Sequence, residues 1–121
     1  QGHVATEGIE IQVLDNTAEK YKTLAPYQYH GSVYGLIPAK RGYLREVGAW
    51  NEQTILMIGR KITITLNGDT IVDGDLDEAL KNGAMDGKEH PGANRVMGHI
   101  GFLGHNDPVA FRKIRIREIG K

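Results

Sequence analysis

Apolar and polar positions alternate through much of this chain, a pattern that is typical of β-strands. In residues 8–15 every second side chain from Ile9 to Val13 is apolar, which predicts a half-buried strand with one core-forming face. The opposite face carries Glu10 beside Gln12. Glu10 is therefore expected to face either solvent or a cleft.

The clearest local signal is a meander of three predicted strands joined by tight turns. Apolar residues alternate with lysine and threonine from Lys61 to Leu66, and Asn67-Gly68 follows directly. Asn-Gly is the preferred two-residue hairpin turn because both positions need a positive φ. The three predicted strands span residues 53–58, 61–66 and 70–72.

The rest of the chain is predicted to contain one short helix and further strands. One or two helical turns are predicted at residues 75–82, where Asp75 or Asp77 can cap the start. Gly83 is then suited to end the helix. The last strand needs a bulge near Arg112 because its apolar residues change phase there. Further strands are predicted at residues 31–37, 98–105 and 109–119, and a long surface loop at residues 17–29.

Composition narrows the class of protein. A chain of 121 residues without cysteine is a single domain that has neither disulfides nor thiolate metal sites. Its charges balance to a formal zero without an evident basic or acidic block, so we expect neither nucleic acid nor a membrane surface as a partner. No apolar run is long enough for membrane insertion. The sixteen glycines suit the many turns of an all-β fold.

Four ordered stretches resemble the 3-keto-disaccharide hydrolase family, whose members are often described as glycosyl hydrolases. The first is the E-x-Q-x-L-D pattern from Glu10 to Asp15, and the second is the G-x-x-Y-G pattern that contains Tyr34. The others are Trp50-Asn51 before a strand that ends at Asn67-Gly68, and the G-H-I-G stretch at residues 98–101 with His105 and the V-A-F-R stretch at residues 109–112. Each stretch is short, but the ordered set extends from Gly8 to Ile119.

The resemblance implies an all-β antiparallel β-sandwich, the concanavalin A-like jelly roll. Family members carry further strands before the E-x-Q strand, so residues 1–121 are expected to form the C-terminal part of a larger jelly-roll domain. An edge left unpaired in this way invites another chain. We therefore expect it to be covered by an N-terminal fragment of the same protein or by a second copy in a homo-oligomer. The resemblance also implies a periplasmic or secreted protein. The sequence departs from the family pattern at Lys113, where the family usually has asparagine.

The chemistry that the resemblance implies is cleavage of 3-keto glycosides. The ketone acidifies the neighbouring C2 proton, so a base can remove it, and elimination of the C1 substituent followed by hydration breaks the glycosidic bond. This reaction needs a general acid, a general base and a stabiliser for the enolate, which leaves a divalent metal open as a cofactor. Glu10 and His105 are the candidates for acid and base.

Five further residues are candidates for binding a carbohydrate substrate. Trp50 can stack on a sugar face, although a lone tryptophan in a sandwich is more often part of the core. In an extended strand His99 lies roughly 20 Å from His105, so one metal ion cannot bind both unless the strand bends. A structural role for His99 therefore stays open. The five candidates are Gln12, Asp15, Tyr34, Trp50 and His99.

The alternative function is a non-catalytic carbohydrate-binding or structural β-sandwich. Its aromatic side chains would line a groove that has no poised base, and fold alone does not distinguish it from an enzyme. The aromatic residues in question are Tyr21, Tyr27, Tyr29 and Trp50. Three further histidines fall in loops and are expected to be solvated: His3, His30 and His90.

Overall fold

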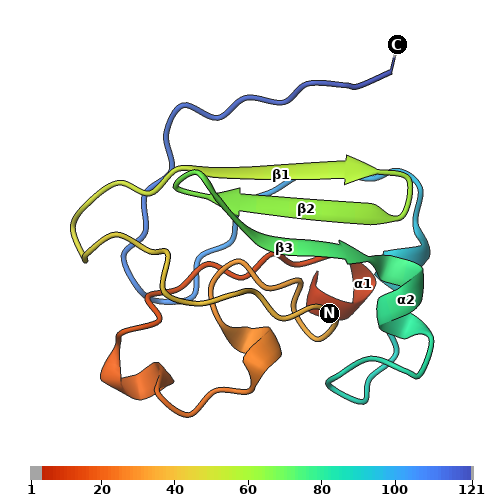
Figure 1. The fold of residues 1–121 in the computed structure, drawn as a ribbon, viewed down its shortest axis with the longest axis horizontal. Helices are drawn as coiled ribbons and strands as arrows, with labels where there is room; N and C mark the ends of the chain where they lie inside the picture. Colours follow the sequence, from red (N-terminus) through yellow and green to blue (C-terminus); the bar gives the residue numbers. More distant parts are fainter. Residues whose placement is uncertain (1–3, 121) are drawn as a thin grey trace.

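The computed structural model describes residues 4–120, and its centre is a three-stranded antiparallel sheet (Figure 1). The strands follow one another in the order β1-β2-β3, which confirms the predicted meander. Four short helical segments and one helix, α2, surround the sheet, so the fold is rich in β-structure. The bounds are α1 Val4–Glu7, η1 Glu19–Tyr21, η2 Pro26–Gln28, β1 Gln53–Ile58, β2 Lys61–Leu66, β3 Asp69–Asp75, α2 Leu76–Leu80 and η3 Pro91–Asn94.

The turn between β2 and β3 has the predicted Asn-Gly geometry. Asn67 and Gly68 both have positive φ, 52° and 89°. Leu66 pairs with Asp69 across the turn, and a register shift follows at Ile64/Thr65. The side chain of Asn67 also accepts a hydrogen bond from the Glu52 amide at 2.9 Å. This asparagine therefore connects the hairpin to the start of β1.

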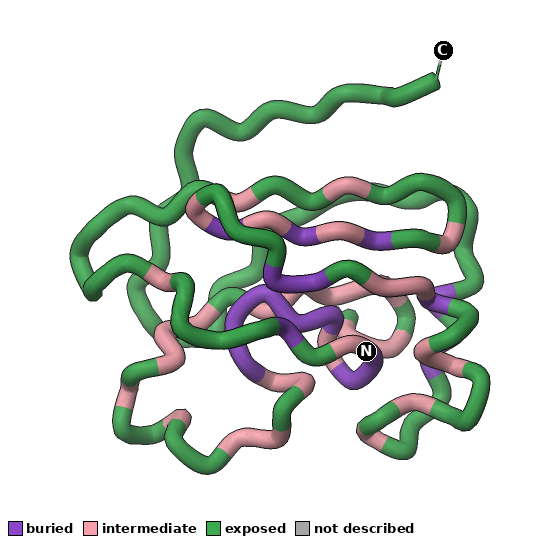
Figure 2. Tube along the Cα trace, in the orientation of Figure 1, coloured by how far each residue is buried: buried purple, intermediate pink, exposed green. Residues whose placement is uncertain are grey.

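One face of the sheet packs against the core and the other is open. Ile62, Ile64 and Leu66 on β2 are almost fully buried, whereas the intervening threonines are only partly covered. Burial of each such side chain contributes about 1.5–3 kcal/mol. The second layer comes from residues 29–39, which include Val33 at 0% exposure (Figure 2). The core therefore lies between β2, β3 and this irregular segment.

The predicted helix after β3 is confirmed. The Asp75 carboxylate accepts hydrogen bonds from the amides of Asp77 and Glu78, which caps α2 at its start. Gly83, at φ 87°, donates its amide to Leu80 and ends the helix. No helix in residues 4–120 has the length and apolar character that crossing a bilayer would require.

The strand prediction for residues 31–37 is wrong. This segment folds back on itself, because Val33 forms a bridge with Ile37 around Gly35, which has φ 78°. In place of the strand predicted at residues 8–15, the structure has a single β-bridge, between Ile11 and Val33. Ile11 packs against the core as expected, but Val13 is 44% exposed.

The two strands predicted in the C-terminal part are not formed. Residues 96–120 belong to no helix or strand, and their side chains are exposed (Figure 2). The bulge expected near Arg112 is not formed either, because a bulge requires a strand pair; Lys113 instead has a left-handed backbone, φ 53°. Phe102 and Phe111 contact each other, with ring centroids 4.6 Å apart. The alternating pattern is present, but a strand needs a neighbouring strand, and no β-bridge is assigned to residues 96–120.

Candidate active site

Glu10 lies in the short ladder that joins residues 10–12 to residues 31–34. Ile11 bridges Val33, and the Tyr34 amide donates to the Glu10 carbonyl at 2.9 Å. Val33 points into the core. Because opposed residues on antiparallel segments share a face, Glu10 and Tyr34 lie side by side on the face away from Val33.

The Glu10 carboxyl is half-buried, and its electrostatic surroundings include His105. Burial raises the pKa of Glu10, and the charge of His105 acts in the opposite direction. His105, which lies far from Glu10 in the sequence, is thus within electrostatic range of this carboxyl. The catalytic roles of Glu10 and His105 stay predictions.

A polar clasp holds the segment that carries His105. The Lys20 ammonium lies 2.6 Å from an Asp107 carboxylate oxygen, and the Tyr21 hydroxyl donates to the same oxygen at 3.2 Å. The hydrogen bond from Lys20 lowers the pKa of Asp107, and the charge of His105 acts in the same direction. This clasp connects η1 to Asp107, two residues after His105.

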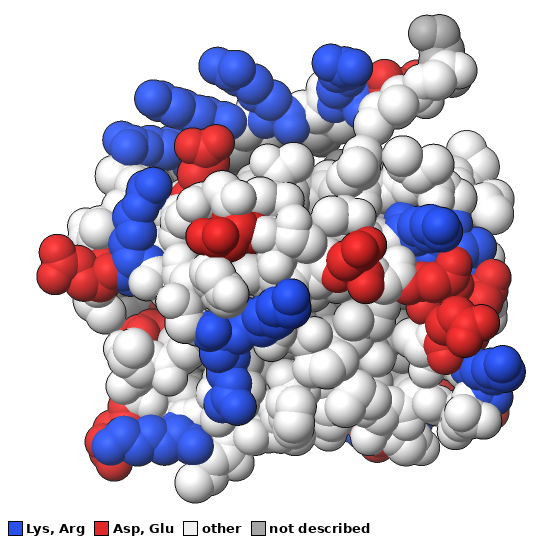
Figure 3. Space-filling view, viewed as in Figure 1, with Lys and Arg blue, Asp and Glu red and all other residues white. Residues whose placement is uncertain are grey.

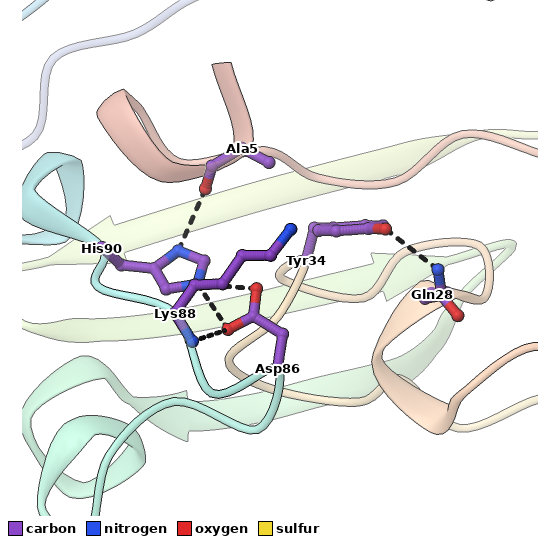
Figure 4. A network of polar contacts seen from close by, with 6 residues as sticks. All are labelled: Ala5, Gln28, Tyr34, Asp86, Lys88 and His90. Carbon is purple, nitrogen blue, oxygen red and sulfur yellow. Dashed lines mark hydrogen bonds and ion pairs between the residues drawn. The ribbon is translucent and has the colours of Figure 1, made fainter. Parts of the chain in front are cut away.

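The Tyr34 hydroxyl is oriented by residues of η2. Gln28 donates from Nε2 to the phenol oxygen at 2.9 Å (Figure 4). The Tyr27 ring packs edge-on against the Tyr34 ring, with the centroids 5.8 Å apart and the planes at 79°. The phenol oxygen accepts from Gln28, so its own hydrogen can be donated elsewhere. Tyr34 therefore offers a hydrogen-bond donor on the face that carries Glu10.

A buried ion pair supports the turn that follows Tyr34, and sequence reasoning missed it. The side chains of His90 and Asp86 are 0% and 6% exposed, and His90 Nε2 lies 2.9 Å from both carboxylate oxygens. His90 Nδ1 lies 3.0 Å from the Ala5 carbonyl (Figure 4). Both ring nitrogens therefore face oxygen atoms, one of a backbone carbonyl and the other of a carboxylate. The expectation of a solvated His90 is wrong.

The Asp86 carboxylate is stabilised in spite of its burial. Burial raises the pKa of Asp86, but hydrogen bonds from the Lys88 amide and the His90 ring, together with the charges of these residues, lower it further than burial raises it. A β-carbon at Gly35 would collide with this carboxylate, so the turn depends on glycine. The signal in the sequence is the pair of acid and histidine four residues apart.

His30 is also buried, so the expectation of a solvated ring is wrong here too. Its Nε2 lies 2.9 Å from Gln53 Oε1, and its Nδ1 accepts from the Leu14 amide at 3.3 Å. Burial lowers the pKa of His30, against the effect of these hydrogen bonds. His30 thus joins residue 14 to β1 as a neutral ring. His3 lies outside the described residues.

Two predicted substrate-binding residues form hydrogen bonds with residues close to them in the sequence. Gln12 accepts a hydrogen bond from the Val13 amide at 3.2 Å. Asp15 accepts from both the amide and the hydroxyl of Thr17, at 2.9 and 2.6 Å, and so stabilises a turn. Neither contact involves the side chain of Glu10.

The other two candidates lie away from this ladder. Trp50 precedes β1 and is 43% exposed, with the Arg112 guanidinium 3.9 Å from its ring centre. The alternative of a core tryptophan is therefore wrong. His99 is exposed in the unpaired C-terminal segment.

The described part of the chain has an open hollow but no cluster of metal ligands. No group of three or more His, Asp or Glu side chains in residues 4–120 is arranged to hold a metal ion. The hollow, of about 510 Å³, lies beside α2, and its walls include Leu80, Ala84 and His90. Neither Glu10 nor His105 lines it.

Comparisons with known proteins give a family match and a similar crystal structure. The sequence matches the family described as "3-keto-alpha-glucoside-1,2-lyase-like domain" over residues 1–117. A crystal structure of a "putative glycosyl hydrolase" from Parabacteroides distasonis ATCC 8503 is similar, with a TM-score of 0.55 and 31% sequence identity. The match covers 58% of this chain and 36% of that chain. No curated protein matches.

Proposed function

The chain belongs to the 3-keto-alpha-glucoside-1,2-lyase-like family, and from this premise we propose that it takes part in the cleavage of 3-keto glycosides by removal of the C2 proton. The observation that carries the proposal is the half-buried Glu10 carboxyl, which lies beside Tyr34 on the ladder and within electrostatic range of His105. A half-buried carboxyl with a raised pKa is better matched to proton transfer near neutral pH than an exposed one.

The reaction needs two proton transfers. The Glu10 carboxylate accepts the C2 proton, and the electron pair of that C–H bond moves toward the C3 carbonyl, which becomes an enolate. The enolate re-forms the C3 carbonyl and a C1–C2 double bond as the C1–O bond breaks, and the leaving oxygen takes a proton from His105. Water then adds to the double bond: its hydroxyl bonds to C1, its remaining proton returns to His105, and Glu10 returns its proton to C2. The sum of these steps is hydrolysis of the glycosidic bond.

Tyr34 is the proposed stabiliser of the enolate. Its hydroxyl oxygen is held by Gln28, so its hydrogen is free to point at the substrate C3 oxygen as negative charge develops there. Tyr34 lies beside Glu10 across the ladder, which puts donor and base on one face. No step is derived through a metal ion.

For the architecture, we infer that the described sheet belongs to a jelly-roll β-sandwich. The likeness to the Parabacteroides protein supports this inference, since the chain aligns with little more than a third of that protein. The uncovered apolar side chains of β1 and residues 96–120 support it as well.

Replacement of the base tests the function. We expect Glu10→Gln to lower turnover of a 3-keto glucoside by about a hundredfold to ten-thousandfold, the range typical of a lost general base. The amide preserves shape, so the unfolding transition should stay close to that of the wild type. Glu89→Gln, at an exposed site, is the matched control and should leave turnover unchanged. Equal turnover by Glu10→Gln and the wild type would refute the assignment.

A carbohydrate-binding module is the second candidate. The perpendicular pair of Tyr27 and Tyr34, together with exposed Trp50, offers aromatic surface to a sugar without any chemistry. This function predicts saturable binding of the 3-keto glucoside by the wild type with no product and with no effect of Glu10→Gln on affinity. Comparing binding and turnover of the 3-keto glucoside by the wild type and Glu10→Gln thus distinguishes the enzyme from the binding module.

A further inference from the structure

Asp86 and His90 differ from the charged side chains at the surface. Figure 3 shows surface side chains of both signs, and basic ones gather along residues 112–117, where the expectation of a chain without a basic block is wrong. The side chains of Asp86 and His90 are instead 6% and 0% exposed. Taking two such groups out of water costs free energy unless they are well paired. Their burial therefore indicates a role inside the fold.

Asp86 holds the turn that follows Tyr34. The Gly35 carbonyl accepts hydrogen bonds from the Met85 amide at 2.8 Å and from the Asp86 amide at 3.4 Å. A β-carbon at Gly35 would collide with the Asp86 carboxylate, so this carboxylate packs directly on the turn. Because Tyr34 precedes Gly35, these contacts fix the backbone from which the Tyr34 side chain extends.

His90 and Gly92 hold the segment that leads to Glu10. His90 Nδ1 lies 3.0 Å from the Ala5 carbonyl oxygen. A β-carbon at Gly92 would collide with the backbone of residues 7–8, so η3 and this segment are in direct backbone contact. Glu10 follows two residues later. The backbone on which Glu10 is carried is therefore fixed from the same loop, residues 85–92, that holds the Tyr34 turn.

The contact between Asp86 and His90 joins these two attachments. His90 Nε2 lies 2.9 Å from both carboxylate oxygens of Asp86. Figure 4 shows the His90 ring between Ala5 and Asp86. The two attached segments meet in the ladder, where the Tyr34 amide donates to the Glu10 carbonyl at 2.9 Å. A shift of one segment along the other would therefore strain or break the contact between Asp86 and His90.

We propose that Asp86 and His90 are positioning residues, which hold the segment of Glu10 and the turn of Tyr34 in one register. Their part in catalysis rests on the proposed function, in which Glu10 takes the C2 proton while Tyr34 stabilises the charge on the C3 oxygen. These two points of the substrate are on neighbouring carbon atoms, so the base and the donor have to stay at a set spacing. A misplacement of about 1 Å can cost about a hundredfold in rate.

The register is measured first, without substrate. The NMR coupling across the hydrogen bond from the Tyr34 nitrogen to the Glu10 carbonyl carbon reports the geometry of the folded protein, so lower stability alone does not change it. Asp86→Asn should reduce this coupling by about half, because a hydrogen bond weakens steeply as its geometry is lost. The hydrogen bond from the Asn67 amide to the Glu52 carbonyl, 2.8 Å long, lies outside the ladder and should keep its coupling.

His90→Gln is the second variant, in case Asp86→Asn does not fold. The glutamine amide can take the place of Nε2 beside Asp86 but leaves no group for the Ala5 carbonyl, so the same coupling should fall. Glu89→Gln is the matched control, because Glu89 is exposed on the same loop. It should keep the wild-type coupling and turnover. The proposal is overturned if the variants of Asp86 and His90 that fold keep the wild-type coupling.

A double-mutant cycle on the 3-keto glucoside tests the part in catalysis. Tyr34→Phe should lower kcat by about a hundredfold, as expected for a lost donor to a developing oxyanion. Asp86→Asn alone should lower kcat by about tenfold and change KM by less than about twofold, since the register matters most in the transition state. In the Tyr34→Phe background, Asp86→Asn should lower kcat by no more than about twofold, because the hydroxyl that it positions is absent.

The cycle separates positioning from stability. An equal loss of kcat from Asp86→Asn in both backgrounds would show that the pair only stabilises the fold, which overturns the proposal. Failure of the proposed function gives a different result: the wild type does not cleave the glucoside, or Tyr34→Phe keeps the wild-type kcat. The coupling between Tyr34 and Glu10 then still decides whether Asp86 and His90 hold the register.

Discussion

At the residue scale, Glu10 balances two opposed effects. Half-burial disfavours the carboxylate and raises its pKa, while the positive charge of His105 favours the carboxylate. The ladder with Tyr34 fixes Glu10 in the fold, and the clasp of Lys20 with Asp107 holds the segment that carries His105. The reactivity of Glu10 therefore depends on contacts between the two ends of the chain.

Removal of the His105 charge should be visible at Glu10. In His105→Gln the opposing effect is lost, so we expect the pKa of Glu10 to rise further above its ordinary value. A ¹³C NMR titration of the glutamate carboxyl signals measures it. His99→Gln, on the same exposed segment, is the control and should leave Glu10 unaffected. An unchanged Glu10 titration in His105→Gln would show that the two groups do not interact.

The pair of Asp86 and His90 should stabilise the fold in a pH-dependent manner. Asp86→Asn removes the buried carboxylate that His90 Nε2 contacts, so we expect a loss of about 3 kcal/mol in the free energy of unfolding near neutral pH. The folded-state pKa of Asp86 is lowered. Its contribution is therefore fully present above the unfolded-state pKa of about 3.9, and it is lost as the pH falls through the folded-state pKa.

Urea unfolding at two pH values measures this contribution. The difference between wild type and Asp86→Asn should be large at about pH 6 and should shrink at about pH 2.5. Asp73→Asn, on the exposed side of β3, should show little difference at either pH. A difference for Asp86→Asn that is constant with pH would contradict the ionised pair.

At the element scale, the sequence predicts the turns and helix starts whose geometry is set by a few adjacent residues. The β2–β3 turn was predictable because both residues of Asn67-Gly68 readily adopt the positive φ that the turn needs. The start of α2 was predictable because Asp75 caps it. Alternation failed at residues 31–37, since it carries no sign that Gly35 turns the chain back. It also failed at residues 98–119, where strand formation depends on a neighbour that the pattern cannot supply.

Substitution of Asn67 in the β2–β3 turn should lower the free energy of unfolding. In Asn67→Ala the positive φ of 52° is strained, and the hydrogen bonds to Tyr43, Asn51 and Glu52 are lost. We expect a loss of about 2 kcal/mol in the free energy of unfolding. Chemical denaturation measures it, with Asn82→Ala at an exposed site as the control. A loss no greater than that of the control would show that the turn does not depend on this asparagine.

At the scale of the whole molecule, the candidate site combines both ends of the chain. Sequence motifs singled out Glu10, Tyr34 and His105; in the fold Glu10 pairs with Tyr34 through a backbone hydrogen bond and lies within electrostatic range of His105. The motifs did not predict Asp86 and His90, because a buried ion pair leaves no periodic signal. They also placed Gln12 and Asp15 in the site, where short-range hydrogen bonds occupy both side chains.

The central claim is that Glu10 removes the C2 proton of a 3-keto glucoside. Proton NMR in D₂O follows this step directly, because a base that takes the proton and returns a deuteron erases the C2 signal of the substrate or product. The wild type should catalyse incorporation of deuterium at C2, and Glu10→Gln should not, while Glu89→Gln should match the wild type. Cleavage by the wild type without deuterium at C2, or equal incorporation by Glu10→Gln, would contradict the account.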